Sequence, residues 1–396
     1  MTLRPLTVLA EHDEYVVGDP ATGRFFAVPL PGVLVLESLR AGMTIGAAAT
    51  SASTSESEVD ALDFSRTLLR VGFVTKVDGQ QVQGADSIVE VAELNAAARR
   101  LGLLLFSAPM LALSGLVLAL VVATLVVRPT LRPSVEDLFV HPEPVVSFAV
   151  LFAISIGTGM IHELCHWWAT RSLGVPAHIR LSRRLYLPVM ETDISGLWSL
   201  PAHRRYGPFL AGMMFDVVTL AIAVGLRLAW SAELLDLPPE LVRILGAFVT
   251  LKAFEVMFQF LVFLRTDLYA VMITALGLRN LDRVTRLRLK AMLHLAKPAE
   301  RTELAEAHPR DIAASRWYSL CYLTGLLWAV WFFKEWFYPS TFVILTWMAS
   351  TLRNAPLGSG YWWQAVVVAM LVGSSLVWPL AVFIRQRAAR RGGMLA

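Results

Sequence analysis

The sequence predicts a mainly α-helical membrane protein, with about six transmembrane helices and a small winged-helix-like domain at its N-terminus. Hydrophobic residues make up 56% of the 396 residues and charged residues only 17%, whereas soluble domains carry about 25% charged residues. Beyond residue 100, apolar stretches long enough to cross a bilayer follow one another. Residues 1–85 contain no such stretch, so we expect them to form a separate, soluble unit.

The N-terminal unit begins with a predicted β-hairpin and continues with helices. Its two strands lie within 15–28 and are joined by a turn at Asp19–Gly23, where Asp, Pro and Gly favour chain reversal. A second apolar segment, a Ser/Thr-rich linker and a helix capped near Gly72 follow, at 32–39, 50–57 and 58–70. A linker at 86–100 with few apolar residues then leads to the membrane domain, 101–396, so we expect the unit to be separable from it.

Six apolar stretches are each long enough for about 30 Å of hydrocarbon. They lie at 101–127, 145–170, 207–230, 244–276, 317–338 and 362–384. The fourth is too long for one straight crossing and contains Arg265 and Asp267 near its end, so we expect it to be a broken helix.

Lysine and arginine residues gather in alternate connections between these stretches. They are frequent before the first stretch, between the second and third, between the fourth and fifth, and after the sixth. The positive-inside rule therefore predicts a multi-pass protein of the cell membrane with both termini in the cytoplasm. The net charge of +4 comes from these connections. It indicates contact with anionic lipid headgroups and not with nucleic acid.

The second stretch contains the run His162-Glu163-Leu164-Cys165-His166. Each ionisable side chain within a bilayer costs several kcal/mol, so this group needs a compensating partner. His162 and His166 lie one helical turn apart on the same face, which suits two imidazole ligands to Zn²⁺. Glu163 beside them is placed to act as a general base. The run therefore predicts a zinc site that hydrolyses peptide bonds.

A third zinc ligand must come from another helix at the same depth. Asp216, early in the third stretch, and Asp267, late in the fourth, both qualify. Either carboxylate is an acceptable zinc ligand, so the residue pattern leaves both assignments open.

Two further patterns lie near these residues. Short apolar alternation over 177–181 and 186–189 predicts a hairpin at the membrane surface, whose edge would pair with an extended substrate; an ordinary amphipathic loop is the alternative. Lys252 and Glu255, three residues apart, are expected to form a buried ion pair, with a proton or substrate path as the functional alternative.

The pairing of His-Glu-x-x-His with a late Asp two stretches further on resembles the site-2 protease family of intramembrane zinc metalloproteases, over about 145–280. Residues 263–269 are similar to the second half of that family's N-P-x-x-x-x-D-G segment, although Leu261-Val262 replace Asn-Pro and Leu268 replaces Gly. Residues 211–216 are similar to its A-G-P-x-x-N segment, with Met213 for Pro and Asp216 for Asn. The resemblance implies these roles: zinc ligands His162, His166 and Asp267, catalytic base Glu163, and substrate-facing Asp216 near the metal.

The N-terminal unit resembles PqqD-like leader-peptide recognition domains, notably at 18–20, 39–42 and 68–74. The two resemblances together imply an intramembrane zinc endopeptidase that removes the leader of a ribosomally synthesised, modified peptide. Cleavage of a membrane-anchored regulator is the alternative within the enzyme class. A non-hydrolytic peptide export or immunity factor that only binds metal is the alternative outside it. The expected partners are a peptide or membrane-peptide substrate and the lipid bilayer, and the oligomeric state is left open.

Overall fold

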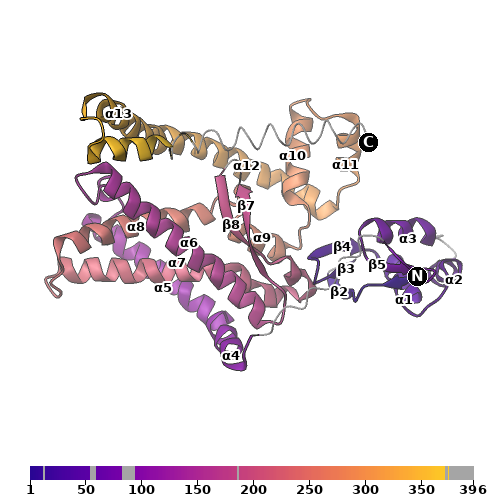
Figure 1. The fold of residues 1–396 in the computed structure, drawn as a ribbon. Helices are drawn as coiled ribbons and strands as arrows, with labels where there is room; N and C mark the ends of the chain where they lie inside the picture. Colours follow the sequence, from indigo (N-terminus) through magenta and orange to yellow (C-terminus); the bar gives the residue numbers. More distant parts are fainter. Residues whose placement is uncertain (12–13, 54–58, 83–93, 185–186, 371–372, 374–396) are drawn as a thin grey trace.

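The fold is that of a mostly helical protein with a small mixed unit at one end (Figure 1). The computed structural model describes residues 1–11, 14–53, 59–82, 94–184, 187–370 and 373. The sixth predicted stretch, 362–384, therefore lies largely outside the described residues.

The N-terminal unit combines two small sheets with three helices around a core of its own. The first sheet is antiparallel, in the order β2-β3-β4, and the second has the order β1-β5-β6. Val17, Leu36 and Phe73 are among the buried core residues. The elements are β1 Thr2–Leu3, β2 Thr7–Glu11, β3 Glu14–Asp19, β4 Arg24–Val28, α1 Leu30–Arg40, α2 Ile45–Ala52, α3 Ala61–Arg70, β5 Val74–Val77 and β6 Gln80–Gln81.

Most of the predicted local structure in this unit is confirmed. β3 and β4 form the expected hairpin, and Gly23 in its turn has a φ of +67°. Gly72, with a φ of +83°, lies where α3 ends. α3 begins at Ala61, later than predicted, because the Asp60 side chain caps it by accepting a hydrogen bond from the Asp63 N–H. Two elements differ from the prediction: β2 precedes the hairpin, and α2 covers the first residues of the predicted Ser/Thr-rich linker.

Three of the described helices are long and apolar enough to cross a membrane: α5 Ala108–Val127, α6 Pro144–Ser172 and α7 Ala202–Ser231. The chain is therefore a helical membrane protein, and the count of six spans stays a prediction. The first predicted stretch is divided, because α4 Ala96–Leu105 ends before α5 begins. Pro109, in the first turn of α5, has no N–H with which to continue a helix from the preceding turn.

The fourth stretch is broken, as predicted. α8 Pro239–Gln259 ends well before α9 Asp267–Leu276 begins, and between them Arg265 adopts a left-handed conformation with a φ of +59°. α9 has 10 residues, too few to cross a bilayer alone. Other helices include η1 Pro129–Leu131, η2 Glu136–Leu138, η4 Val262–Leu264, α10 Leu281–Met292, α11 Pro298–Ala305, α12 Pro309–Phe332, the π-helical turn η5 Phe333–Phe337 and α13 Tyr338–Asn354.

α7 packs against α5, α6, α8 and α9, so it lies at the centre of this group of helices (Figure 1). Between α6 and α7 the chain forms the hairpin predicted at the membrane surface, β7 His178–Arg184 and β8 Leu187–Asp193. A short helix, η3 Ser195–Ser199, connects β8 to α7. The sheet of the N-terminal unit lies against η3, so this connection joins the two parts of the molecule.

Candidate metal centre

Three side chains from two helices converge on one point. His162 and His166 come from α6, and Asp267 is the first residue of α9. The two Nε2 atoms lie 3.1 Å apart, and each lies 3.3 Å from Oδ2 of Asp267. Metal ions in proteins are commonly bound by His, Cys, Asp and Glu side chains. Among the described residues, these three make up the group of such side chains that lie close enough together to share a metal ion.

The local backbone explains this convergence. Residues four apart on a helix share a face, which brings the two histidines together. Asp267 reaches them because the helix break turns the chain: its N–H donates to Oε1 of Gln259 at 3.1 Å, and the Thr266 hydroxyl donates to the Gln259 carbonyl at 2.6 Å. From α12, the Tyr318 hydroxyl donates to the Val262 carbonyl at 3.0 Å and supports the same break.

The outer nitrogen of each histidine is already bonded. Nδ1 of His166 lies 2.7 Å from the carbonyl oxygen of Pro208 in α7, and since a carbonyl has no proton, Nδ1 must donate. Nδ1 of His162 lies 2.7 Å from Oδ2 of Asp216, whose Oδ1 accepts from Nζ of Lys252 at 2.8 Å. With Nδ1 of each ring used as a donor, Nε2 is the nitrogen that each histidine has left for a metal, as in metal-binding histidines.

The cluster fits a cation and fits zinc in particular. Two nitrogen lone pairs and a carboxylate oxygen at these distances repel one another unless a positive charge lies among them. Oδ2 of Asp267 is buried and accepts no hydrogen bond from the described residues, so the two imidazoles are its only close polar neighbours among them. Tetrahedral zinc with bonds of about 2.0–2.1 Å separates its ligands by about 3.3 Å. The three atoms match one face of such a tetrahedron, and two imidazoles with one carboxylate leave its fourth position open.

Both Asp216 and Asp267 are candidates for the third ligand by sequence, and the structure places them differently. Asp267 joins the cluster, whereas Asp216 is 1% exposed and bonds both His162 and Lys252. Asp216 therefore orients a histidine, and the substrate contact implied for it stays a prediction. The predicted ion pair between Lys252 and Glu255 is confirmed; Lys252 also binds Asp216, which the sequence did not indicate.

Glu163 is held by the hairpin. The backbone N–H and the hydroxyl of Thr192 both donate to Oε2 of Glu163, each at 2.8 Å, and the same hydroxyl lies 2.9 Å from the Glu163 carbonyl oxygen. Thr192 lies near the end of β8, beyond the part of the hairpin that apolar alternation revealed. No pattern in the sequence links these two residues, which are 29 positions apart.

Gly212 gives α7 room to approach His162, one of the three candidate ligands. A Cβ at this position would lie 2.4 Å from Nε2 of His162, whereas a Cβ at Gly225 of the same helix would meet nothing within 4 Å. We therefore expect Gly212→Ala to displace the imidazole and weaken metal binding at least about 10-fold, although alanine favours helix by about 1 kcal/mol. Gly225→Ala is the matched control. Zinc content after dialysis against a chelator measures the effect, and equal retention by both variants would contradict this packing.

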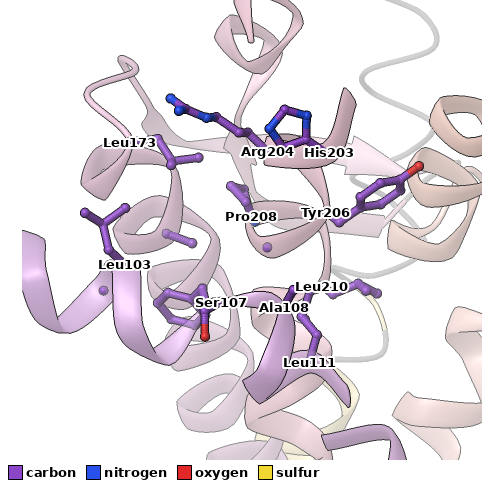
Figure 2. Close-up of a pocket in the computed structure, with 14 residues that line it drawn as sticks. Leu103, Ser107, Ala108, Leu111, Leu173, His203, Arg204, Tyr206, Pro208 and Leu210 are labelled. Carbon is purple, nitrogen blue, oxygen red and sulfur yellow. The ribbon is translucent and has the colours of Figure 1, made fainter. Parts of the chain in front are cut away.

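A cavity of about 410 Å³ adjoins the site. It lies among α4, α5, α6 and α7, with His203 and Arg204 at one side and Leu103 and Leu111 among its apolar lining (Figure 2). Pro208 lines it and also binds His166, so the cavity neighbours the metal centre. None of the three candidate ligands lines it.

No protein-family model, no curated protein and no solved structure matches the chain.

Proposed function

We propose that the chain is an intramembrane zinc endopeptidase that removes the leader from a ribosomally synthesised precursor peptide. The convergence of two Nε2 atoms and one carboxylate oxygen, with a glutamate next to them in α6, is the observation that supports it most. When bound, zinc supplies a Lewis acid that polarises a peptide carbonyl and makes water easier to deprotonate.

Residues of the chain would then transfer the protons and orient the two histidines. Thr192 holds Oε2 of Glu163, so Oε1 remains to take a proton from the attacking water. Glu163 returns this proton to the leaving amine when the peptide bond breaks. The Lys252–Asp216 pair keeps the proton of His162 on Nδ1, and the Pro208 carbonyl does the same for His166.

The proposed topology places this site near the cytoplasmic face. His166 lies six residues before the end of α6 at Ser172, which is about 9 Å at 1.5 Å per residue. The connection that follows contains Arg180, Arg183 and Arg184, which favours the cytoplasm. With α8–α9, α12 and the stretch 362–384 as further spans, both termini are cytoplasmic in this proposal.

The N-terminal unit is proposed as the winged-helix-like, PqqD-like reader of the leader. β4 lies at one end of the order β2-β3-β4, so one edge of this strand has no partner strand in the described sheet. Phe26 on β4 is 43% exposed, and Leu62 and Leu69 on the neighbouring α3 are 49% and 42% exposed. The Arg24 side chain reaches the Val71 carbonyl at the end of that helix. An open strand edge beside exposed apolar side chains suits an extended peptide.

A peptide library derived from a digested proteome tests the hydrolytic activity without knowledge of the natural substrate. We expect purified full-length protein in lipid nanodiscs to generate new peptide termini over time, detected by mass spectrometry, and Glu163→Gln to generate none. New termini formed equally by both proteins would point to a contaminating protease and contradict the proposal. Zinc binding without any cleavage would favour the non-hydrolytic export or immunity factor.

Cleavage of a membrane-anchored regulator is the second candidate. It is favoured by the position of His162 and His166 inside a helix apolar enough to span the bilayer. A single-span model substrate without a leader, reconstituted beside the full-length protein, distinguishes it. Such a substrate should be cut if the function is regulator cleavage and should stay intact if the function is leader removal.

A further inference from the structure

A buried ion pair joins the N-terminal unit to the membrane helices. Arg205, in the first turn of α7, is fully buried, and its two terminal nitrogens each donate to one carboxylate oxygen of Glu11 at 2.9 Å. The guanidinium lies 4.5 Å from the centre of the Trp198 ring. Arg279, before α10, pairs with Glu14 at the start of β3. Two-point bonding between an arginine and a carboxylate fixes orientation as well as distance.

The other end of the same sheet rests on η3. A Cβ at Gly23 would lie 3.0 Å from the Cβ of Ser195, and one at Gly196 would lie 3.4 Å from the Pro20 carbonyl oxygen. β4 begins at the next residue, Arg24. The start of β4 is therefore in contact with a residue only three positions after Thr192, which holds Glu163.

We propose, resting on the proposed function, that the docked N-terminal unit is a fixed spacer, and that a peptide paired antiparallel with β4 presents one bond at a set distance from Glu163. β4 runs from Arg24, beside η3, to Val28. An antiparallel peptide enters at Val28 and leaves at Arg24 with its C-terminal end directed at the site. A parallel peptide would direct its N-terminal end there. A leader precedes the part of the peptide that is released. Only the antiparallel direction therefore brings the junction between the leader and the released part to the site.

The geometry sets the spacing. Three residues from Ser195 back to Thr192 span at most about 10 Å at 3.3–3.4 Å per extended residue. The bond to be cut therefore lies about three to five residues beyond the peptide residue opposite Arg24. A peptide that begins opposite Leu30 needs seven residues to reach the position opposite Gly23. The bond to be cut then lies about ten residues from the first residue of the peptide.

Peptides tethered to the full-length protein test this directly. In a Cys321→Ser background, Leu30→Cys provides an anchor just beyond β4, at a site that is 51% exposed. Ala47→Cys provides a matched, exposed anchor on α2, at the end of the unit farthest from the membrane helices (Figure 1). The Cys321→Ser protein with neither added cysteine is the control that shows how much peptide attaches to Cys165. The probes are valine- and threonine-rich maleimide peptides of 6–16 residues, coupled through the N-terminus or, in a second set, through the C-terminus.

We expect N-terminally coupled peptides at residue 30 to be cut at one position, about ten residues from the anchor, whatever their length beyond it. Cleavage should be at least about 10-fold slower in three cases: shorter peptides, peptides coupled through the C-terminus, and peptides anchored at residue 47. Glu11→Gln, which keeps the shape of the side chain but removes its charge, should spread the cut over several bonds.

The outcomes separate the spacer from the proposed function. Equal cleavage from both anchors, or cut positions that follow the peptide sequence instead of the distance, would overturn the spacer. The spacer would also be overturned if the tethered peptides stay intact on a protein that still cuts the peptide library. If neither the tethered peptides nor the library is cut, the proposed function itself fails, and the inference fails with it.

Discussion

Glu163→Gln is expected to abolish peptide cleavage while leaving the metal in place. Glutamine keeps an oxygen that accepts the hydrogen bonds of Thr192, so the helix and the hairpin should keep their positions. It has no carboxylate with which to take a proton from water, and loss of a general base costs about 10²–10⁴-fold in rate. Initial rates on a peptide identified from the library, together with zinc content, measure both effects.

Glu191→Gln is the matched control. This glutamate lies one residue before Thr192 on β8, where it pairs with Arg180 and has no contact with the metal ligands in the described structure. Its rate should stay within about twofold of wild type. Undiminished cleavage by Glu163→Gln would refute the assigned base.

Asp267→Ala is expected to produce the largest loss of zinc among the acidic residues, because it removes one of three ligand atoms and leaves two imidazoles. Asp216→Ala removes the partner that orients His162 and should weaken binding less, by about 10–100-fold. Turnover should fall in both. Zinc retained against chelators of increasing strength ranks the variants.

Asp236→Ala, in the exposed connection before α8, controls for the loss of an acid elsewhere. It should retain zinc as wild type does. Zinc lost from Asp216→Ala but kept by Asp267→Ala would mean that the roles of the two acids are reversed.

Local patterns predicted much of the site. The His-Glu-x-x-His run places two histidines on one face by helical periodicity alone. The interruption at Arg265 and Asp267 marks the helix break, because charged residues rarely continue an apolar span. The hairpins at 15–28 and 177–189 follow from alternation and turn residues. Each of these signals lies within a few positions of the chain.

Contacts between distant residues could not be predicted. Glu11 and Arg205 are 194 positions apart, and nothing near either residue indicates the other. The spacing of Lys252 and Glu255 predicts their ion pair, whereas the bond between Lys252 and Asp216 depends on how α7 and α8 pack. Packing of one helix against another decides such pairs, and one sequence does not reveal it.

The docking of the N-terminal unit changes one expectation. The sequence favours a separable unit, because its linker has few apolar residues. In the structure, Glu11 bonds the buried guanidinium of Arg205. Removal of residues 1–85 would leave that charge without its partner, at the start of the helix that also carries Pro208, Gly212 and Asp216. We therefore expect the truncated protein to hold zinc less firmly than the full chain.

X-ray absorption at the zinc edge, on full-length protein expressed with ample zinc, is the direct test of the proposed metal site. We expect about one zinc per chain, with a first shell of nitrogen and oxygen only at about 2.0–2.1 Å and the scattering pattern of two imidazoles. His166→Ala should lose most of the metal. Absence of zinc, or a sulfur shell at about 2.3 Å that would place Cys165 on the metal, would contradict the His162, His166 and Asp267 site.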